Sequence, residues 1–184
     1  KNFFYYQYKD KTKVTTDSFG FRINHNSNKS YKIAVIGWSQ IWGSGVSDDE
    51  TLPWRLSEKT TLPVFNASRT SLFNSLKRDD LQNVDLIIDS SGIYPNVVAA
   101  HKLIQSGIKK VIVTHTPKDT IDQTIIIGAN EKMYDPQKHH VVSASICDAN
   151  ACAPVLKTLS DQVGITDGFI TTLHPWLGYQ NLLD

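Results

Sequence analysis

Cysteine, methionine, long apolar runs and net charge are all scarce in this sequence. Its 184 residues include two cysteines and one methionine, and 19 Lys and Arg stand against 18 Asp and Glu, a formal net charge of +1. Two cysteines five positions apart do not suggest a disulfide scaffold, and the balanced charge provides no bulk field for nucleic acid or a membrane surface. No apolar run approaches the roughly 18 to 20 residues of a membrane span. We therefore expect a cytoplasmic protein with neither a nucleic-acid nor a membrane partner.

Apolar runs and helical patterns alternate along the middle of the chain. The uninterrupted Leu-Ile-Ile run at 86–88 is typical of a parallel strand that is buried on both faces. Alternation of this kind predicts an α/β fold with a doubly wound, mostly parallel sheet, which binds its ligands at the carboxyl ends of the strands. Strands are predicted at residues 31–36, 63–66, 85–89, 110–114 and 124–128, and helices at residues 51–59, 70–77 and 97–106.

The first 30 residues differ from the rest, because they are polar and aromatic without a clear period. They predict an irregular arm with at most one short strand. Their aromatic side chains are expected to pack onto the domain that follows.

Cys147 and His174 are 27 residues apart, and the segment between them predicts that they meet. A helix from 148 to 163, ended by Gly164, rises roughly 24 Å at about 1.5 Å per residue. A strand over 169–173, with its flanking residues, returns roughly 23 Å at about 3.3 Å per residue. His174 then ends level with Cys147 at the helix N-terminus, where backbone N–H groups favour a thiolate. A thiolate beside an imidazole is an activated nucleophile, although an isolated cysteine is more often a small buried hydrophobe.

The residues around this pair resemble the active-site signature of the phosphorylating glyceraldehyde-3-phosphate dehydrogenase family. That signature reads A-S-C-T-T-N-C-L-A-P and later T-T-V-H. Here residues 145–154 read S-I-C-D-A-N-A-C-A-P and residues 171–174 read T-T-L-H at the same spacing. The resemblance covers about residues 84 to 184 and includes 84–92, 107–114 and 128–135. It implies that Cys147 is the acyl-accepting nucleophile, that His174 is its base, and that a small-molecule aldehyde is the substrate.

The composition of the first residues and the resemblance together predict three parts of the chain. Residues 1–30 are an N-terminal arm, residues 31–147 a Rossmann-like nucleotide-binding domain, and residues 148–184 the beginning of a catalytic domain. The chain ends ten residues after His174, whereas the family continues into a complete second domain with oligomer contacts. We expect a truncated piece of a longer protein, which is a homo-oligomer when complete.

NAD or NADP is the cofactor that the resemblance implies, and the first loop is where its diphosphate would lie. A dinucleotide loop needs glycines because the backbone must approach the diphosphate closely. Gly37 is kept, whereas Ser39 and Trp42 replace the second and third glycines of the family pattern. The residues that the resemblance assigns to cofactor binding are Gly37, Ser39, Gln40, Ile41, Asn66, Ser91, Gly92 and Thr114.

Residues 15 to 70 are similar to the start of a second family, the SGNH or GDSL-type esterases and acyltransferases. The segments that carry this likeness are D-S-F-G-F-R at 17–22, the strand ending at Gly37, and G-S-G-V-S-D-D-E-T-L-P at 43–53. In that family the nucleophile would be Ser39. Trp38 replaces the preceding aspartate and no base for Ser39 is visible, so the likeness indicates a scaffold without the hydrolytic chemistry.

The flanks of Cys147 depart from the dehydrogenase pattern where phosphate is bound. Asp148 replaces a threonine that binds the attacking phosphate, and Leu177 and Tyr179 replace threonines that hold the substrate phosphate. A carboxylate close to a phosphate costs about 1 to 4 kcal/mol, depending on the effective dielectric. Three hypotheses follow, in this order: an aldehyde oxidoreductase acting on a non-phosphorylated substrate, a nucleotide-binding or assembly domain that has lost catalysis, and an SGNH-type esterase or acyltransferase that uses Ser39.

Overall fold

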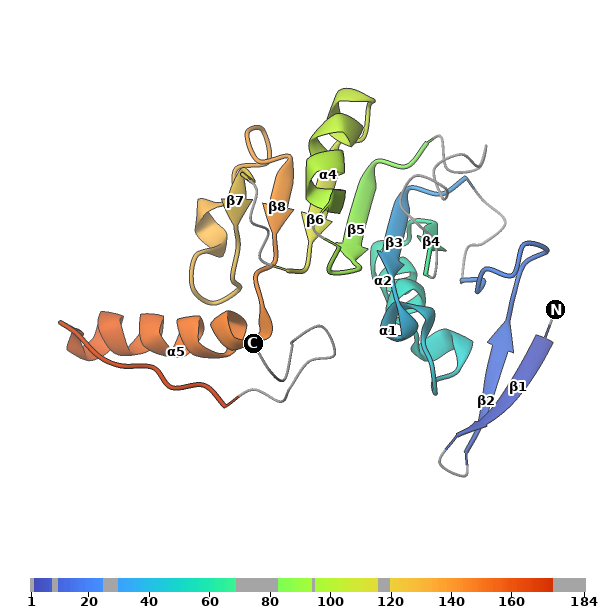
Figure 1. The fold of residues 1–184 in the computed structure, drawn as a ribbon, viewed down its shortest axis with the longest axis horizontal. Coiled ribbons are helices and arrows are strands. Elements are labelled where there is room, and N and C mark those ends of the chain that lie inside the picture. The colour runs from blue at the N-terminus through green and yellow to red at the C-terminus, as the bar shows by residue number, and fades with distance from the viewer. Residues whose placement is uncertain are drawn as a thin grey trace, which may run out of the picture.

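A six-stranded sheet in which every neighbouring pair is parallel forms the centre of the molecule (Figure 1). The computed structural model describes residues 2–7, 10–24, 30–68, 83–93, 95–115 and 120–173. The predicted α/β fold with a parallel sheet is confirmed. The strands are β3 (Ile33–Gly37), β4 (Val64–Asn66), β5 (Leu86–Ser90), β6 (Lys110–Val113), β7 (Gln123–Thr124) and β8 (Val141–Ser143), in the order β4-β3-β5-β6-β8-β7.

Helices lie on both faces of the sheet. Local signals explain α2, because the Thr51 side chain accepts a hydrogen bond from the Trp54 N–H at 3.3 Å and Pro53 lies in the first turn. The predicted helix at 70–77 lies outside the described residues. The helical elements are α1 (Ser39–Trp42), η1 (Asp48–Glu50), α2 (Leu52–Thr60), α4 (Pro95–Gln105), η3 (Glu131–Met133) and α5 (Cys147–Val163).

The two faces of the sheet are covered to different extents. On one face Ile87 and Val111 are buried against Val97 and Ala100 of α4. On the other face the helices α1 and α2 cover β3 and β4, but Leu86 remains half-buried and lines an apolar pocket of about 420 Å³ together with residues of β6 and β8. The prediction of a strand buried on both faces was therefore wrong for β5, because no described helix covers that part of the sheet.

The N-terminal segment is more regular than its sequence predicted. Strands β1 (Asn2–Gln7) and β2 (Asp10–Thr15) form an antiparallel hairpin, so the expectation of an irregular arm was wrong. Pairing between two short strands supplies hydrogen bonds that composition alone does not reveal. The expected aromatic packing is seen beyond the hairpin, since the ring centroids of Phe21 and Tyr31 each lie 5.0 Å from that of Phe65.

Two predicted strands differ from the structure, and one strand was missed. The strand expected at 124–128 is limited to β7, because the Asn130 amide bonds to Thr124 O at 2.9 Å and Ile126 N at 2.7 Å and thereby forms a turn. The strand expected at 169–173 is absent. Phe169 is fully exposed there, and a strand requires a partner that satisfies its backbone groups. The short strand β8 was not predicted.

Candidate functional site at the carboxyl ends of the strands

Cys147 is the first residue of α5 and follows β8 by only three residues, so it lies at the carboxyl end of the sheet (Figure 1). The connecting loop is held by the Ser145 N–H, which donates to the Ser143 hydroxyl at 2.9 Å. Ser145 has a φ of +64°, a backbone conformation that residues other than glycine adopt rarely. Strain of this kind costs about 1 to 3 kcal/mol and is frequent at functional sites.

Asn150 braces the same loop from inside the helix. Its Nδ2 donates to Ala144 O at 2.9 Å and to Ile146 O at 2.8 Å. Farther along the helix, Pro154 lies against Gly128, where an added Cβ would approach the proline Cβ to 3.3 Å. These contacts fix the start of α5 and hence the direction of the Cys147 side chain.

The Cys147 side chain is exposed and contacts an acid. Its Sγ donates to Asp148 Oδ1 at 3.5 Å, in a contact between adjacent residues of the first helical turn. The helix N-terminus favours a negative charge at this place, while the carboxylate disfavours one. The two effects oppose each other in thiolate formation at Cys147.

His174 lies outside the described residues, so its meeting with Cys147 stays a prediction. The helix itself is confirmed, and Gly164 ends it with a φ of +76°. Figure 1 shows the next described residues, through Leu173, turning back from the far end of α5 toward its start. They do so without forming the predicted strand.

The first loop is held by contacts within the chain. A Cβ added at Gly37 would overlap the Ile41 side chain, so the glycine is required for packing. Asn66 is fully buried, donates to Ile41 O at 3.0 Å and accepts from Ser68 N at 3.3 Å. The side chains of Ser39 and Gln40 are outside the described part of the structure.

The ends of β5 and β6 are more open. Thr114 donates through its hydroxyl to the Ser90 hydroxyl at 3.1 Å, and Gly92, with a φ of +69°, has no atom within 4 Å of an added Cβ. Trp38 reaches across from the end of β3, where its Nε1 donates to Ser91 O at 3.0 Å. The predicted cofactor residues Ser91, Gly92 and Thr114 thus lie along one edge of the sheet.

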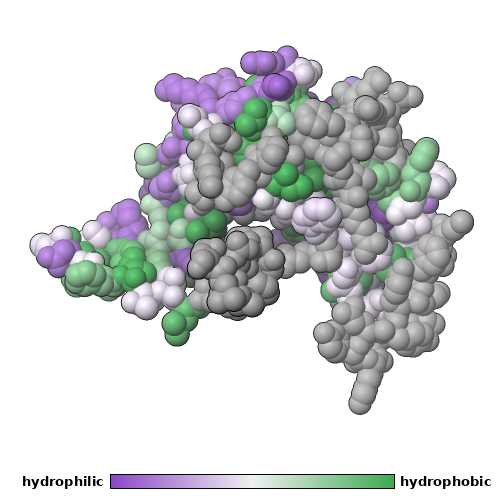
Figure 2. Space-filling view, viewed as in Figure 1, coloured by the Kyte–Doolittle hydropathy of each residue, from purple (hydrophilic) through white to green (hydrophobic). Residues whose placement is uncertain are grey.

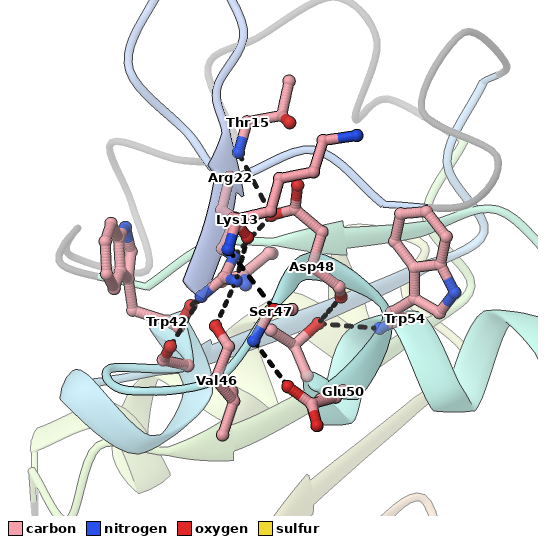
Figure 3. Close-up of polar contacts among 12 residues, drawn as sticks. Lys13, Thr15, Arg22, Trp42, Val46, Ser47, Asp48, Glu50 and Trp54 are labelled. Carbon is pink, nitrogen blue, oxygen red and sulfur yellow. Dashed lines mark hydrogen bonds and ion pairs between the residues drawn. The ribbon is translucent and has the colours of Figure 1, made fainter. Parts of the chain in front are cut away.

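Arg22 is a structural residue that sequence reasoning missed (Figure 3). Its guanidinium is buried, contacts Asp48 at 2.8 Å, and donates to the carbonyls of Trp42, Gly43, Val46 and Lys13 at 2.6–3.3 Å. Asp48 also accepts from Thr15 N at 3.1 Å. The likeness of 17–22 and 43–53 to the esterase family was the available signal. The cluster ties the hairpin to the loop after α1.

Neither a metal centre nor a transmembrane helix is found in the described parts of the chain. Among those residues, no three His, Cys, Asp or Glu side chains are grouped as metal ligands. None of the described helices combines the length and hydrophobicity needed to cross a bilayer.

Comparison with known proteins gives matches to glyceraldehyde-3-phosphate dehydrogenases, while no protein-family profile matches the chain. Glyceraldehyde-3-phosphate dehydrogenase 2 of Streptomyces avermitilis is 42% identical over 102 residues, which are 55% of this chain and 30% of that protein. The Geobacillus stearothermophilus enzyme is 40% identical over 101 residues, with the same shares, and the chloroplastic enzyme of Chondrus crispus is 37% identical over 102 residues, 25% of its length.

The matched part is therefore a fraction of each relative, since the chain spans about 30% or less of the length of these curated proteins. The matched length agrees with the 101 residues from Val84 to Asp184, where the motifs occur. Over 55% of its length, the chain resembles the glyceraldehyde-3-phosphate dehydrogenase family.

Proposed function

We propose that this chain carries the nucleotide-binding part and the nucleophile of an NAD(P)-dependent aldehyde oxidoreductase of the glyceraldehyde-3-phosphate dehydrogenase type. The observation that carries the proposal is the position of Cys147. It is exposed, follows a strained loop, and begins a 17-residue helix at the carboxyl end of a parallel sheet. A thiol placed there has the access and the favourable helix terminus that a nucleophile requires.

The chemistry assigned to the chain begins with addition to an aldehyde. The Cys147 sulfur forms a bond to the carbonyl carbon, and the thiol proton leaves to His174, which is the proposed base. A bound nicotinamide would supply the acceptor for the hydride that leaves this carbon. The enzyme is then acylated on Cys147 as a thioester, which water or another acceptor cleaves to restore the thiol.

The proposed cofactor residues are those predicted from the sequence. The geometry gives more support to some of them than to others. Ser91, Gly92 and Thr114 are supported by their common edge and by the open space at Gly92. The loop residues Gly37, Ser39, Gln40 and Ile41, together with Asn66, are the proposed contacts of the other half of the nucleotide. Because Asn66 is buried and bonded within the chain, its support for binding would act through the position of Ile41.

The substrate proposed for this site is a non-phosphorylated aldehyde. Asp148 contacts the Cys147 sulfur, so a phosphate that approached this sulfur would meet a carboxylate as well. Water or a neutral acceptor avoids that repulsion. The acid therefore supports an oxidation that ends in hydrolysis instead of phosphorolysis.

The division of the chain is also part of the proposal. Residues 1–30 are the proposed N-terminal arm, residues 31–147 the proposed nucleotide-binding domain, and residues 148–184 the beginning of the proposed catalytic domain. None of the residues of α5 is buried, which supports its assignment to a different packing unit. The complete protein is proposed to be a cytoplasmic homo-oligomer.

Trapping of the acylated enzyme tests the proposal directly. The protein is incubated with NAD or NADP and a panel of aldehydes, including glyceraldehyde 3-phosphate, with and without inorganic phosphate. We expect a mass increase of one acyl group at Cys147, which is lost in Cys147→Ser and kept in the matched control Cys152→Ser. Absence of an adduct with every aldehyde would contradict the role of Cys147 as the nucleophile. Turnover of glyceraldehyde 3-phosphate that rises with phosphate would contradict the proposed non-phosphorylated substrate.

A second candidate is a nucleotide-binding or assembly domain that no longer catalyses oxidation. The acid beside Cys147 favours it, because the Sγ to Oδ1 contact of 3.5 Å opposes the thiolate. Thiol labelling at pH 6 to 7 separates the two candidates. A Cys147 that reacts no faster than a free thiol supports the second, while faster reaction supports the oxidoreductase.

A further inference from the structure

Trp38 stands at the point where the order of the strands changes direction. It follows β3 directly, with β4 on one side of that strand and β5 on the other (Figure 1). In open parallel sheets, ligands bind in the crevice at this point, outside the carboxyl ends of the strands. The indole crosses the crevice, because its Nε1 donates to the backbone oxygen of Ser91, which follows β5.

The side chain is fixed and yet accessible. Trp38 is 57% exposed although its Nε1–H is bonded at 3.0 Å. The acceptor residue is itself fixed, since the Ser91 N–H donates at 2.9 Å to Asp89, a carboxylate that is 1% exposed. An aromatic surface held in this way loses little conformational freedom when a ligand binds to it.

Polar groups and open space lie beside the loop that anchors the indole. The hydroxyls of Ser90 and Thr114 are bonded to each other, and each keeps further hydrogen-bonding capacity. Gly92 has no atom within 4 Å of an added Cβ. A flat apolar surface next to a few convergent polar groups is the usual composition of a small-molecule site.

We propose that Trp38 is a ligand-binding residue on whose indole the planar ring of a nucleotide stacks, with Ser90, Gly92 and Thr114 beside it. The proposal rests on the nucleotide-binding role argued above. It adds Trp38 to the predicted contact residues and leaves all of those in place. A purely structural tryptophan is expected to bury its ring, whereas this one is 57% exposed. Stacking on an aromatic side chain is the contact that every nucleotide ring can make.

Binding of mononucleotides tests the assignment. Adenosine monophosphate, nicotinamide mononucleotide, NAD and ribose 5-phosphate are titrated by calorimetry and by tryptophan fluorescence into the protein, Trp38→Ala, Trp38→Phe and the control Trp54→Phe. We expect Trp38→Ala to weaken binding of at least one of the ring-containing ligands by about 10-fold or more. Trp38→Phe should retain most of the affinity, and Trp54→Phe should change neither the affinity nor the quenching.

Ribose 5-phosphate separates stacking from phosphate binding, because it lacks the ring, and its affinity should be equal in the protein and in Trp38→Ala. Circular dichroism and thermal unfolding check that the variants fold. Equal nucleotide affinity for the protein and Trp38→Ala overturns the role of Trp38 alone and leaves the proposed function standing. Absence of nucleotide binding to the unmodified protein overturns both.

Discussion

The first and last parts of the described chain use their side chains in opposite ways. Around Arg22 a charged group is fully enclosed, and carbonyls from the hairpin and from the loop after α1 satisfy it (Figure 3). Along α5 apolar side chains are exposed instead: Val155 is 58% exposed and Val163 is 76% exposed. Figure 2 shows hydrophobic surface, in green, on the arm that α5 forms.

The Arg22 region encloses its charged group within the chain, whereas α5 leaves apolar side chains exposed. Buried charge is tolerated when every donor has an acceptor, and Arg22 meets that condition within the chain. Large exposed apolar patches are a common feature of interaction surfaces. The Cys147 motif that resembles the dehydrogenase signature lies at the start of α5, in the part with the exposed surface.

Loss of the buried guanidinium is expected to have one of the largest effects on stability. Arg22→Ala leaves Asp48 buried without its charge partner and takes one donor away from four carbonyls, so we expect a loss of about 3 to 5 kcal/mol in the free energy of unfolding. Urea unfolding of Arg22→Ala measures it. The control Arg55→Ala removes only an exposed pair with Glu58, which is worth about 1 kcal/mol at most. Equal losses for the two variants would show that the Arg22 cluster is not a source of stability.

Two phenylalanines provide a matched test of the contrast between the regions. Phe65 is 2% exposed and packs on Phe21 and Tyr31, so Phe65→Ala should cost about 3 to 5 kcal/mol. Phe169 is fully exposed, and Phe169→Ala should change stability by no more than about 0.5 kcal/mol. Both values come from the same unfolding measurement. A large cost at Phe169 would indicate that the region after α5 packs on the domain.

Removal of the acid beside Cys147 tests the electrostatics of the candidate site. Asp148→Thr takes away a carboxylate at 3.5 Å from the sulfur. We expect thiol labelling of Cys147 to become about tenfold faster, which corresponds to about 1.4 kcal/mol. Labelling with a thiol reagent at pH 7 measures it. Asp161→Thr, more than three turns along the same helix, is the control. An unchanged rate in Asp148→Thr would remove the electrostatic argument for the proposed substrate.

The smallest expected effect is a pH dependence at Asp122, which joins the segment before β7 to β8. Burial acts to raise the pKa of Asp122, but the backbone N–H groups of Val141 and His140 and the nearby imidazoles lower it by more, so the net pKa is below its ordinary value. Because the pKa is lower in the folded state, this stabilisation is present above about pH 4 and is lost as the pH falls through the folded pKa.

Unfolding in urea between pH 5 and pH 2 checks the direction. The stability of the unmodified protein should fall more steeply over this range than that of Asp122→Asn. Parallel curves would mean that the two N–H contacts contribute nothing to stability in this region.

Elements with a local signal could be predicted from the sequence. The threonine cap and Pro53 predicted α2, the apolar runs predicted β3, β5 and β6, and Gly164 marked the end of α5. Short elements without such a signal were missed. The three-residue β8 is a strand because Val111 and Val113 of β6 pair with it, and the hairpin exists because β1 and β2 pair with each other.

Only the part of the candidate site that depends on local sequence could be predicted. The sequence located Cys147 at the start of a helix, since that position depends on the pattern of one helix. The contact of Trp38 with Ser91 could not be predicted, because the two residues are 53 positions apart and meet only when β3 and β5 pair.

The sequence by itself determined the alternation of strands and helices, the resemblance to a dehydrogenase family, and the acid that follows the candidate nucleophile. These properties depend on residue type and on spacing within a few turns of chain. Only the tertiary structure decided which charges are enclosed, which face of the sheet stays open, and which side chains line the crevice. Those properties depend on residues that are distant in sequence, and strand pairing brings such residues together.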